Sequence, residues 1–347
     1  MGAWLSTGTE SLLDQHIVLD HGTGARLSRE LVEFVVGVLG DVYTGEMEDS
    51  AMLPIPVGRI AMTTDSFVVD PPFFGNGDIG KIAVCGTVND LAVVGAQPLY
   101  LTLAMILETG LPIARLHQAL VSIRDTAREA GVKIVAGDTK VVGEGEADGI
   151  FLNTTGIGVF HEEPKRMTDV QVGDRIVLSG PIGNHTVHLL SVREGLGFEQ
   201  RVVSDCAPLN GMIDSLRDKV PAGAVRSMRD VTRGGLSAVL HEYSSALGRA
   251  VRIEESALPI DHDTRMAADM LGINPINAAN EGCLALFVAP EAVDAVVETL
   301  HAHEYGRRAV VIGEITERAE KAVEMVGEDG RISEIEELKG AELPRLC

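Results

Sequence analysis

Three aspartates lie at positions where a carboxylate seldom stays without a partner. Asp65 follows apolar residues in "AMTTDSF", Asp90 stands within "TVNDLAV", and Asp138 follows the strand-like "IVAG". Because removing a carboxylate from water is costly unless a partner neutralises it, these positions favour a bound cation. Mg²⁺ takes carboxylate oxygens together with phosphate oxygens and water, so the three aspartates predict a magnesium–nucleotide site. The alternative is that each one caps a helix or a turn.

Three glycine-bearing loops could bind phosphate through backbone N–H groups. The loop "HGTGA" begins at His21, "GNGDIGK" ends at Lys81, and "RDVTRGGL" carries Thr232 and Arg233 just before a predicted helix. Neither of the first two loops matches G-x-x-x-x-G-K-[ST] or G-x-G-x-x-G, so the Walker and Rossmann patterns are excluded. The loops are therefore either phosphate sites of another kind or ordinary connections.

Two further side chains could handle protons. Lys140 follows Asp138 by two residues, so on an extended segment both side chains project from the same side. Glu281 precedes the apolar run "CLALF", where burial would suit a proton acceptor. A place in a surface turn is the alternative for Glu281.

The cysteines fall into two groups. The chain has four cysteines and no CxxC pair, so neither a disulfide framework nor a zinc site is predicted. Cys85 and Cys283 lie in apolar runs and are predicted to be core residues. Cys347 ends the acidic segment "AELPRLC", where a thiol is open to oxidation unless chemistry is carried out on it.

Composition predicts a globular protein that avoids polyanions. The 347 residues exceed one ordinary core, so two domains are expected. A formal charge of -22 repels phosphate backbones and anionic lipid, which argues against nucleic acid and membrane partners. The chain contains neither a run of about 18 apolar residues nor a basic N-terminal region before an apolar run, so a cytoplasmic location is expected.

The elements alternate without a strict βαβ rhythm, which favours two α+β domains. Predicted helices cover 27–40, 75–98 with Asp78 as its cap, 112–131, 184–195, 234–248 and 291–303. Predicted strands cover 59–70, 99–107, 132–137, 149–160, 174–180, 223–232, 249–255, 283–290 and 308–315. We expect an N-terminal segment at 1–40, a nucleotide-binding domain at 41–163, a second domain at 170–318 and an acidic flexible tail at 319–347.

An ordered series of motifs resembles one family. "HGTGA", "TTDSFVVDPPFF", "GDIGKIAVCGTVNDLAVVGAQPLYL", "GDTKVV", "VSDCAPL", "RDVTRGG", "NEG" and the final "PRLC" occur in this order from about residue 18 to Cys347. Together they resemble the HypE family of hydrogenase maturation factors, within the aminoimidazole ribonucleotide synthetase superfamily. The Pro-Arg-hydrophobic-Cys ending distinguishes that family from its relatives.

The resemblance implies both an assembly and a reaction. It implies a two-domain fold whose N-terminal sheets pair across a homodimer, with ATP and Mg²⁺ bound near the interface. A carbamoyltransferase, HypF, would load a carbamoyl group onto Cys347, and ATP would drive its dehydration to a thiocyanate. The cyano group would pass to a HypC–HypD scaffold as a ligand for the iron of a [NiFe]-hydrogenase.

The resemblance also implies residue roles. Asp65, Asp90 and Asp138 would bind Mg²⁺ and the nucleotide phosphates. Further phosphate contacts would come from the loops, through His21, Gly22, Gly24, Lys81, Thr232 and Arg233. Glu281 would deprotonate the amide nitrogen, and Lys140 would orient the intermediate or assist proton transfer.

Other functions remain open at this point. Selenophosphate synthetase and thiamine monophosphate kinase share the superfamily, but the first loop here lacks a reactive cysteine paired with lysine, and neither enzyme has a use for "PRLC". A non-catalytic adaptor is the alternative from a different class, and it would release no ADP.

Overall fold

A computed structural model of the chain describes residues 13–22, 26–44, 58–317 and 321–337. The chain divides into two compact units. Of the described residues, those up to 91 together with 97–160 form the N-terminal unit, and 92–96 together with 161–337 form the C-terminal unit. Within the described residues, no helix has the length and apolar character needed to cross a membrane.

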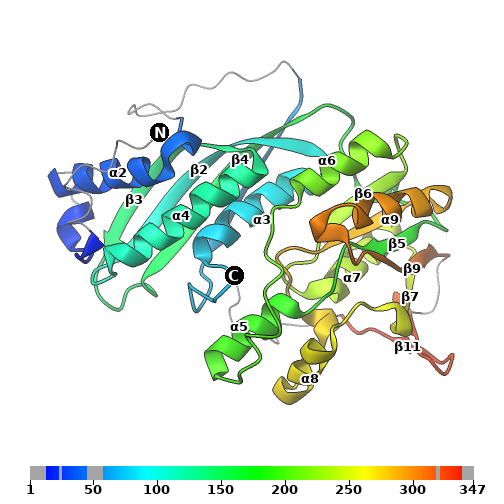
Figure 1. The fold of residues 1–347 in the computed structure, drawn as a ribbon. Coiled ribbons are helices and arrows are strands. Elements are labelled where there is room, and N and C mark those ends of the chain that lie inside the picture. Colours follow the sequence, from blue (N-terminus) through cyan, green and yellow to red (C-terminus); the bar gives the residue numbers. More distant parts are fainter. Residues whose placement is uncertain (1–12, 23–25, 45–57, 318–320, 338–347) are drawn as a thin grey trace. The chain divides into compact units, whose positions relative to one another are not determined.

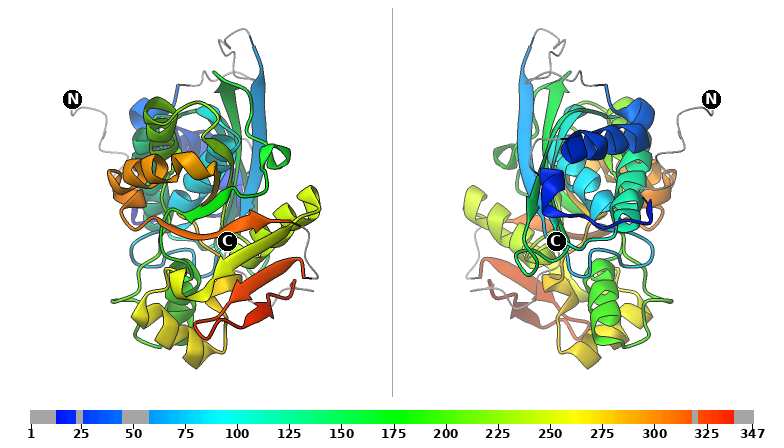
Figure 2. Two further views of the ribbon diagram at one scale, coloured as in Figure 1. Left: turned by 90° about the vertical axis from the view of Figure 1, so that its right-hand side faces the viewer. Right: turned by 90° about the vertical axis from the view of Figure 1, so that its left-hand side faces the viewer.

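The N-terminal unit is a four-stranded sheet with helices on one face. In spatial order its strands are β1 (Ile60–Phe67), β4 (Ile150–Phe160), β2 (Ala96–Glu108) and β3 (Lys133–Val142). Its helices are α2 (Arg26–Leu39), α3 (Ile79–Val93) and α4 (Ile113–Ala130). Strands β1 and β4 are antiparallel, whereas β2 and β3 are parallel and are joined through α4. Figures 1 and 2 show these helices against the same face of the sheet.

Helix α3 is packed tightly against its neighbours. A Cβ on Gly80 would lie 2.2 Å from the Ala119 carbonyl oxygen of α4, and one on Gly156 of β4 would lie 2.6 Å from the Thr87 methyl of α3. Glycine is therefore required at both contacts. The predicted cap is confirmed, because the backbone N–H of Lys81 donates to the Asp78 carboxylate at 3.0 Å.

Among the described residues of the N-terminal unit, no helix covers the opposite face of the sheet. Strand alternation places Met62 of β1 and Ile106 of β2 on this open face, where they are 68% and 41% exposed. Asn153 of β4 donates there to the hydroxyls of Thr64 and Ser66 at 3.2 and 3.0 Å. The part of the open face formed by β1, β4 and β2 thus carries apolar and hydroxyl side chains.

The C-terminal unit contains a mixed sheet of seven strands. In spatial order they are β11 (Ile332–Glu334), β10 (Val323–Val326), β7 (Ala250–Glu254), β9 (Val310–Thr316), β5 (Arg175–Leu178), β8 (Leu284–Val288) and β6 (Val225–Asp230). The helices are α5 (Asn184–Glu194), α6 (Asn210–Lys219), α7 (Gly235–Leu247), α8 (His262–Leu271) and α9 (Val293–His301). This unit and the N-terminal one are each α+β, as predicted.

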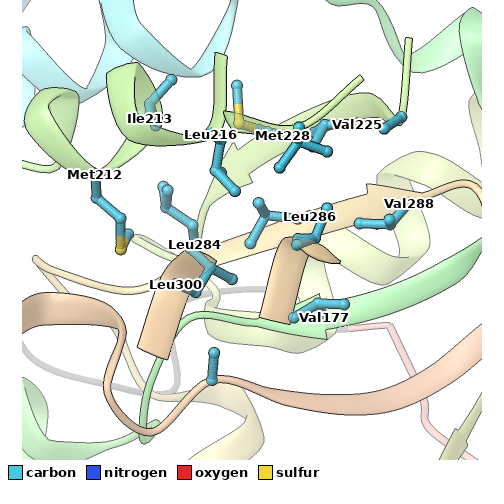
Figure 3. Close-up of a cluster of buried hydrophobic side chains, with 14 of the residues drawn as sticks. Val177, Met212, Ile213, Leu216, Val225, Met228, Leu284, Leu286, Val288 and Leu300 are labelled. Atoms are coloured by element: carbon cyan, nitrogen blue, oxygen red, sulfur yellow. The ribbon is translucent and has the colours of Figure 1, made fainter. Parts of the chain in front are cut away.

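The central strands of the C-terminal sheet are buried on both faces. On β8, Leu284 and Leu286 join a core with α6 and α9, whereas Ala285 and Phe287 join a core with α7. Figure 3 shows the first of these cores, in which Leu284 and Leu286 lie between side chains of α6 and Val177 of β5. Two-sided burial explains why β8 reads as a continuous apolar run instead of an alternating one.

The sequence prediction missed several elements of the C-terminal unit. Helices α6 and α8 were not predicted. The proposed tail at 319–347 is corrected, because β10 and β11 form an antiparallel hairpin and β10 pairs in parallel with β7. Val323 of β10 is fully buried, so tertiary pairing overrides the charged composition of this segment. Residues 338–347 lie outside the described part of the chain.

Candidate nucleotide and proton-transfer site

Asp65 and Asp90 lie along the same contact between β1 and α3. The Thr63 hydroxyl of β1 donates to Oδ2 of Asp90 at 2.9 Å. An Oδ2 atom of Asp65 lies 3.4 Å from where a Cβ would stand on Gly86 of α3. Thr63 and Asp65 are two residues apart on one side of a strand, and Gly86 and Asp90 are one turn apart on a helix. The two carboxylates therefore occupy neighbouring positions on one strand–helix layer.

This pair has the donor chemistry for Mg²⁺. Both side chains are only half-buried, and Oδ1 of Asp65 accepts from the backbone N–H of Ser66 at 2.9 Å. No group of three or more His, Cys, Asp or Glu side chains suited to a metal occurs among the residues the structure describes. Two carboxylates alone do not complete the coordination of a metal ion. They suit Mg²⁺, which takes its remaining oxygen ligands from phosphate and water.

Asp138 lies on the other face of the sheet. It is exposed on β3 opposite Ala104, on the open face, and its carboxylate pairs with Nζ of Lys140 at 2.8 Å. The predicted common side for Asp138 and Lys140 is therefore confirmed. Within one chain the three aspartates do not converge, because strand geometry separates Asp138 from Asp65 and Asp90; its role toward nucleotide stays a prediction.

The first glycine loop is described only in part. His21 lies in the short 3-10 helix η1 (Leu19–Gly22), and its side chain is buried, with 4% exposed. Its Nδ1 atom accepts a hydrogen bond from the Val18 N–H at 3.0 Å. Gly22 closes η1, whereas Gly24 lies outside the described residues. Contacts of this loop with phosphate therefore stay a prediction.

Asp78 and Lys81 form the start of α3. The Ser122 hydroxyl of α4 donates to Asp78 at 2.5 Å. Burial raises the pKa of Asp78 above 3.8, while the bonds from Ser122 and from the backbone N–H groups of Lys81 and Gly80 oppose that rise. Lys81 itself is half-buried in the first turn of α3.

Three loops of the C-terminal unit meet at Asn280. Its backbone N–H and its Nδ2 both donate to the Val231 carbonyl oxygen at 3.0 Å, and its Oδ1 accepts from the Gly183 N–H at 2.8 Å. Asn280 thereby joins "NEG" to "RDVTRGG" and to the loop before α5. Sequence reasoning quoted the motif "NEG" but assigned no role to this residue.

Glu281 is buried and held by its backbone. It is 4% exposed, so the surface-turn alternative is excluded. The N–H groups of Glu281 and Gly282 donate to the two carboxylate oxygens of Asp205 at 3.0 and 3.2 Å. Asp205 was also missed, although it lies in the motif "VSDCAPL". The proton-transfer role of Glu281 stays a prediction.

Asp230 ends β6 beside the predicted phosphate residues Thr232 and Arg233. Burial raises the pKa of Asp230, while Arg229, the Thr232 hydroxyl and Arg233 act in the opposite direction. Arg233 is exposed. Glycine is required at position 235 of this loop. A Cβ on Gly235 would lie 2.5 Å from the Ile276 carbonyl oxygen, and the residue has a φ of +63°.

The described cysteines are buried thiols. Cys85, Cys206 and Cys283 are free and at most 3% exposed, which confirms the core assignment of Cys85 and Cys283. Burial raises the pKa of Cys283 to about 12, so this thiol stays protonated and unreactive. Cys347 lies outside the described residues.

Comparison with known proteins gives full-length matches. Residues 47–160 match the family model "AIR synthase related protein, N-terminal domain", and residues 171–326 match the corresponding C-terminal domain. A relative from Rhizobium leguminosarum bv. viciae, named carbamoyl dehydratase HypE, is 41% identical over 338 residues that cover 95% of each chain.

Two solved structures are similar along the same length. A crystal structure of the hydrogenase maturation protein HypE in complex with ATP is 38% identical with a TM-score of 0.90, and the match covers 95% of this chain and 99% of that one. The chain in a crystal structure of a HypE–HypF complex is 40% identical with a TM-score of 0.77, and the match covers 90% and 100%.

Proposed function

This chain belongs to the HypE family of carbamoyl dehydratases, within the AIR synthase related proteins, and we propose that it uses ATP to dehydrate a carbamoyl group carried on Cys347. The product is a thiocyanate that supplies a cyanide ligand for the iron of a [NiFe]-hydrogenase. The observation that carries the proposal is the match over 95% of both chains to a carbamoyl dehydratase, with the ATP complex of a 38% identical protein in support.

The proposed reaction removes one molecule of water at the expense of one ATP. An amide oxygen is a poor leaving group, so it first attacks the γ-phosphorus of ATP, and the bond to ADP breaks. The carbon then carries a phosphate ester, which can depart as phosphate. Loss of both N–H protons and cleavage of the C–O bond convert S–C(=O)–NH₂ into S–C≡N.

The N-terminal unit would bind the nucleotide. Asp65 and Asp90 would hold Mg²⁺, which would neutralise charge on the phosphates during transfer. Further donors would come from His21, Gly22, Gly24 and Lys81. The half-buried pair of carboxylates on β1 and α3 supports this assignment, since its oxygens suit a hard ion.

The C-terminal unit would contribute the proton acceptor. Glu281 would take a proton from the amide nitrogen, and its burial supports this role because water is kept from the carboxylate. Thr232 and Arg233 would donate to phosphate oxygens. Lys140 of the N-terminal unit would orient the intermediate, and Asp138 beside it would help to bind the nucleotide.

Three kinds of partner belong to the proposal. HypF would load Cys347, and the crystal structure of a HypE–HypF complex supports this pairing. A HypC–HypD scaffold would receive the cyano group. A second copy of this chain would cover the open face, whose exposed Met62 and Ile106 support a sheet-to-sheet contact.

Mass spectrometry of the intact protein tests the reaction. The chain is incubated with carbamoyl phosphate, the partner transferase and ATP, and its mass is followed over time. We expect the gain of one carbamoyl group and then the loss of one water, with ADP and phosphate released in equal amounts.

Two variants sharpen this experiment. Cys347→Ala should abolish both mass changes and leave ATP binding intact, because the thiol carries the substrate and does not bind nucleotide. Cys85→Ala, which changes a buried core thiol, should still show both mass changes. An unmodified Cys347 peptide under competent conditions would refute the proposal.

A further inference from the structure

The carboxylate of Asp205 binds two consecutive backbone N–H groups of the Glu281 loop. Oδ1 accepts from Glu281 at 3.0 Å and Oδ2 accepts from Gly282 at 3.2 Å. The Glu281 carbonyl oxygen in turn accepts from the Ala207 N–H at 3.3 Å. Hydrogen bonds from neutral donors to a charged acceptor are among the stronger ones in proteins, so this bidentate contact fixes the backbone that carries Glu281.

The same contact leaves no room for adjustment. A Cβ on Gly282 would lie 1.8 Å from the Asp205 carbonyl oxygen and 3.3 Å from the Ala207 backbone nitrogen. Residues 205–207 therefore pack directly on the Cα of Gly282. Any change in the direction of the 205–207 segment has to move the Glu281 backbone with it.

A buried imidazole contacts the residue that precedes Asp205. His185 of α5 is fully buried, and its Nδ1 lies 2.8 Å from the Ser204 hydroxyl. The Ser204 oxygen also accepts from the Cys206 N–H at 3.1 Å, which folds the backbone tightly around Asp205. The backbone on either side of Asp205, at Ser204 and Cys206, is thus fixed by buried polar contacts.

We propose that Asp205 is a positioning residue for the reaction, which acts by holding Glu281 through the backbone N–H groups of residues 281 and 282. The inference rests on the proposed function, because Glu281 is the proton acceptor there. A proton acceptor works only within hydrogen-bond reach of its proton, and the Asp205 contact sets where Glu281 stands.

Asp205→Asn tests the proposal with little change in shape. The asparagine side chain has one oxygen that can accept a backbone N–H, and its NH₂ group cannot accept the other. One of the two hydrogen bonds to the Glu281 loop is therefore lost. We expect the rate of water loss from the carbamoylated protein to fall about 10- to 100-fold, because small displacements of a reacting group have effects of this size. Affinity for Mg-ATP should stay within about twofold of the wild type.

Asp174→Asn is the matched control. Asp174 is a buried aspartate that, like the half-buried Asp205, accepts a backbone N–H bond, from Gln171 at 2.8 Å, but it lies away from the Glu281 loop. Thermal unfolding should show similar losses of stability for both variants, and only Asp205→Asn should lose activity. Equal losses of activity would mean that Asp205 acts only through stability and would overturn the proposal.

A double-mutant cycle separates positioning from an independent effect. In a Glu281→Gln background, followed by single-turnover mass spectrometry over hours, adding Asp205→Asn should change the rate by less than about twofold. A further loss as large as in the wild-type background would overturn the proposal. If the wild-type chain itself never loses water, the proposed function fails; if the wild type is active and Asp205→Asn matches it, only this inference fails.

Discussion

Among the three aspartates, the side of the strand on which each one lies decides what it can bind. The strand β3 carries a bulge, because Leu101 of β2 pairs with Ile134 and the next residue, Thr102, pairs with Ala136. Without the extra residue Val135, Asp138 would stand on the helix face. A shift of one residue reverses the direction of every following side chain, so Asp138 points to the open face.

This explains what single-residue reasoning could and could not predict. Carboxylates next to apolar runs were recognisable as unusual, and for Glu281 the apolar strand behind it suggested burial but left a surface turn open as the alternative. The face of the sheet on which Asp138 lies could not be predicted, because it depends on the bulge in β3, and a bulge forms only when a strand pairs with a second strand. Asp205 and Asn280 were missed since their contacts join segments far apart in the sequence.

Asp90→Asn should weaken binding of Mg-ATP by about 10-fold or more, because a neutral amide is a poor ligand for a hard cation. The amide oxygen can still accept from Thr63, so folding should be preserved. Isothermal titration calorimetry with Mg-ATP measures the effect.

The control for this prediction is Asp125→Asn. Asp125 lies on α4 and pairs with Arg124 and Arg128 on the exposed surface. Its replacement should leave the affinity unchanged. An Asp90→Asn protein that binds as tightly as this control would remove Asp90 from the site.

Local signals predicted the elements that have strong caps or clear periodicity. Helix α3 was predicted with Asp78 as its cap, and Gly95 follows it at a φ of +86°. Helix α6 was missed because its buried face consists of few side chains, chiefly Met212, Ile213 and Leu216, among charged residues. The hairpin of β10 and β11 was missed because its stability comes from pairing with β7 and not from its composition.

The cap of α3 makes stability depend on pH. The pKa of Asp78 is raised in the folded chain, so between 3.8 and that raised value the folded state binds the proton more tightly than the unfolded state. The contribution of this proton to the free energy of unfolding is therefore greatest below pH 3.8, and it is lost as the pH rises through the raised pKa of Asp78.

Asp78→Asn should remove this dependence and keep the cap, since an amide oxygen can accept from Lys81. The free energy of unfolding of the wild type minus that of the variant should fall as the pH rises across the acidic range. Urea unfolding at a series of pH values gives the difference. A difference that rises with pH would contradict the assignment.

On the scale of the molecule, composition and element order predicted two α+β units, and both are present. Composition and element order could not predict which side chains are exposed on each unit, because exposure depends on how the elements pack. The N-terminal sheet buries one face under helices and leaves Met62 and Ile106 exposed on the other. An apolar sheet face of this kind is suited to pairing with a second copy, which is the predicted homodimer.

Met62→Asp should dissociate that dimer, because the substitution would bury a charge between two sheets. Light scattering after size-exclusion chromatography should then report the mass of one chain. Met270→Asp on α8 is the matched control, since Met270 is 65% exposed and Met62 is 68% exposed. A wild-type chain that already has the mass of one copy would contradict the homodimer.

The β10–β11 hairpin also limits the distance over which the thiol can travel. Ile335, just after β11, is 8% exposed, accepts from His241 of α7 at 2.9 Å and donates to the Val323 carbonyl oxygen at 3.1 Å. Eleven residues separate this anchor from Cys347. Fully stretched, they span roughly 40 Å, so any enzyme that loads or processes the sulfur has to come within that radius of the root of the tether. If Cys347 carries the carbamoyl group as proposed, its covalent attachment within this reach would give the thiol a high local concentration, and a free small-molecule thiol should compete poorly with it.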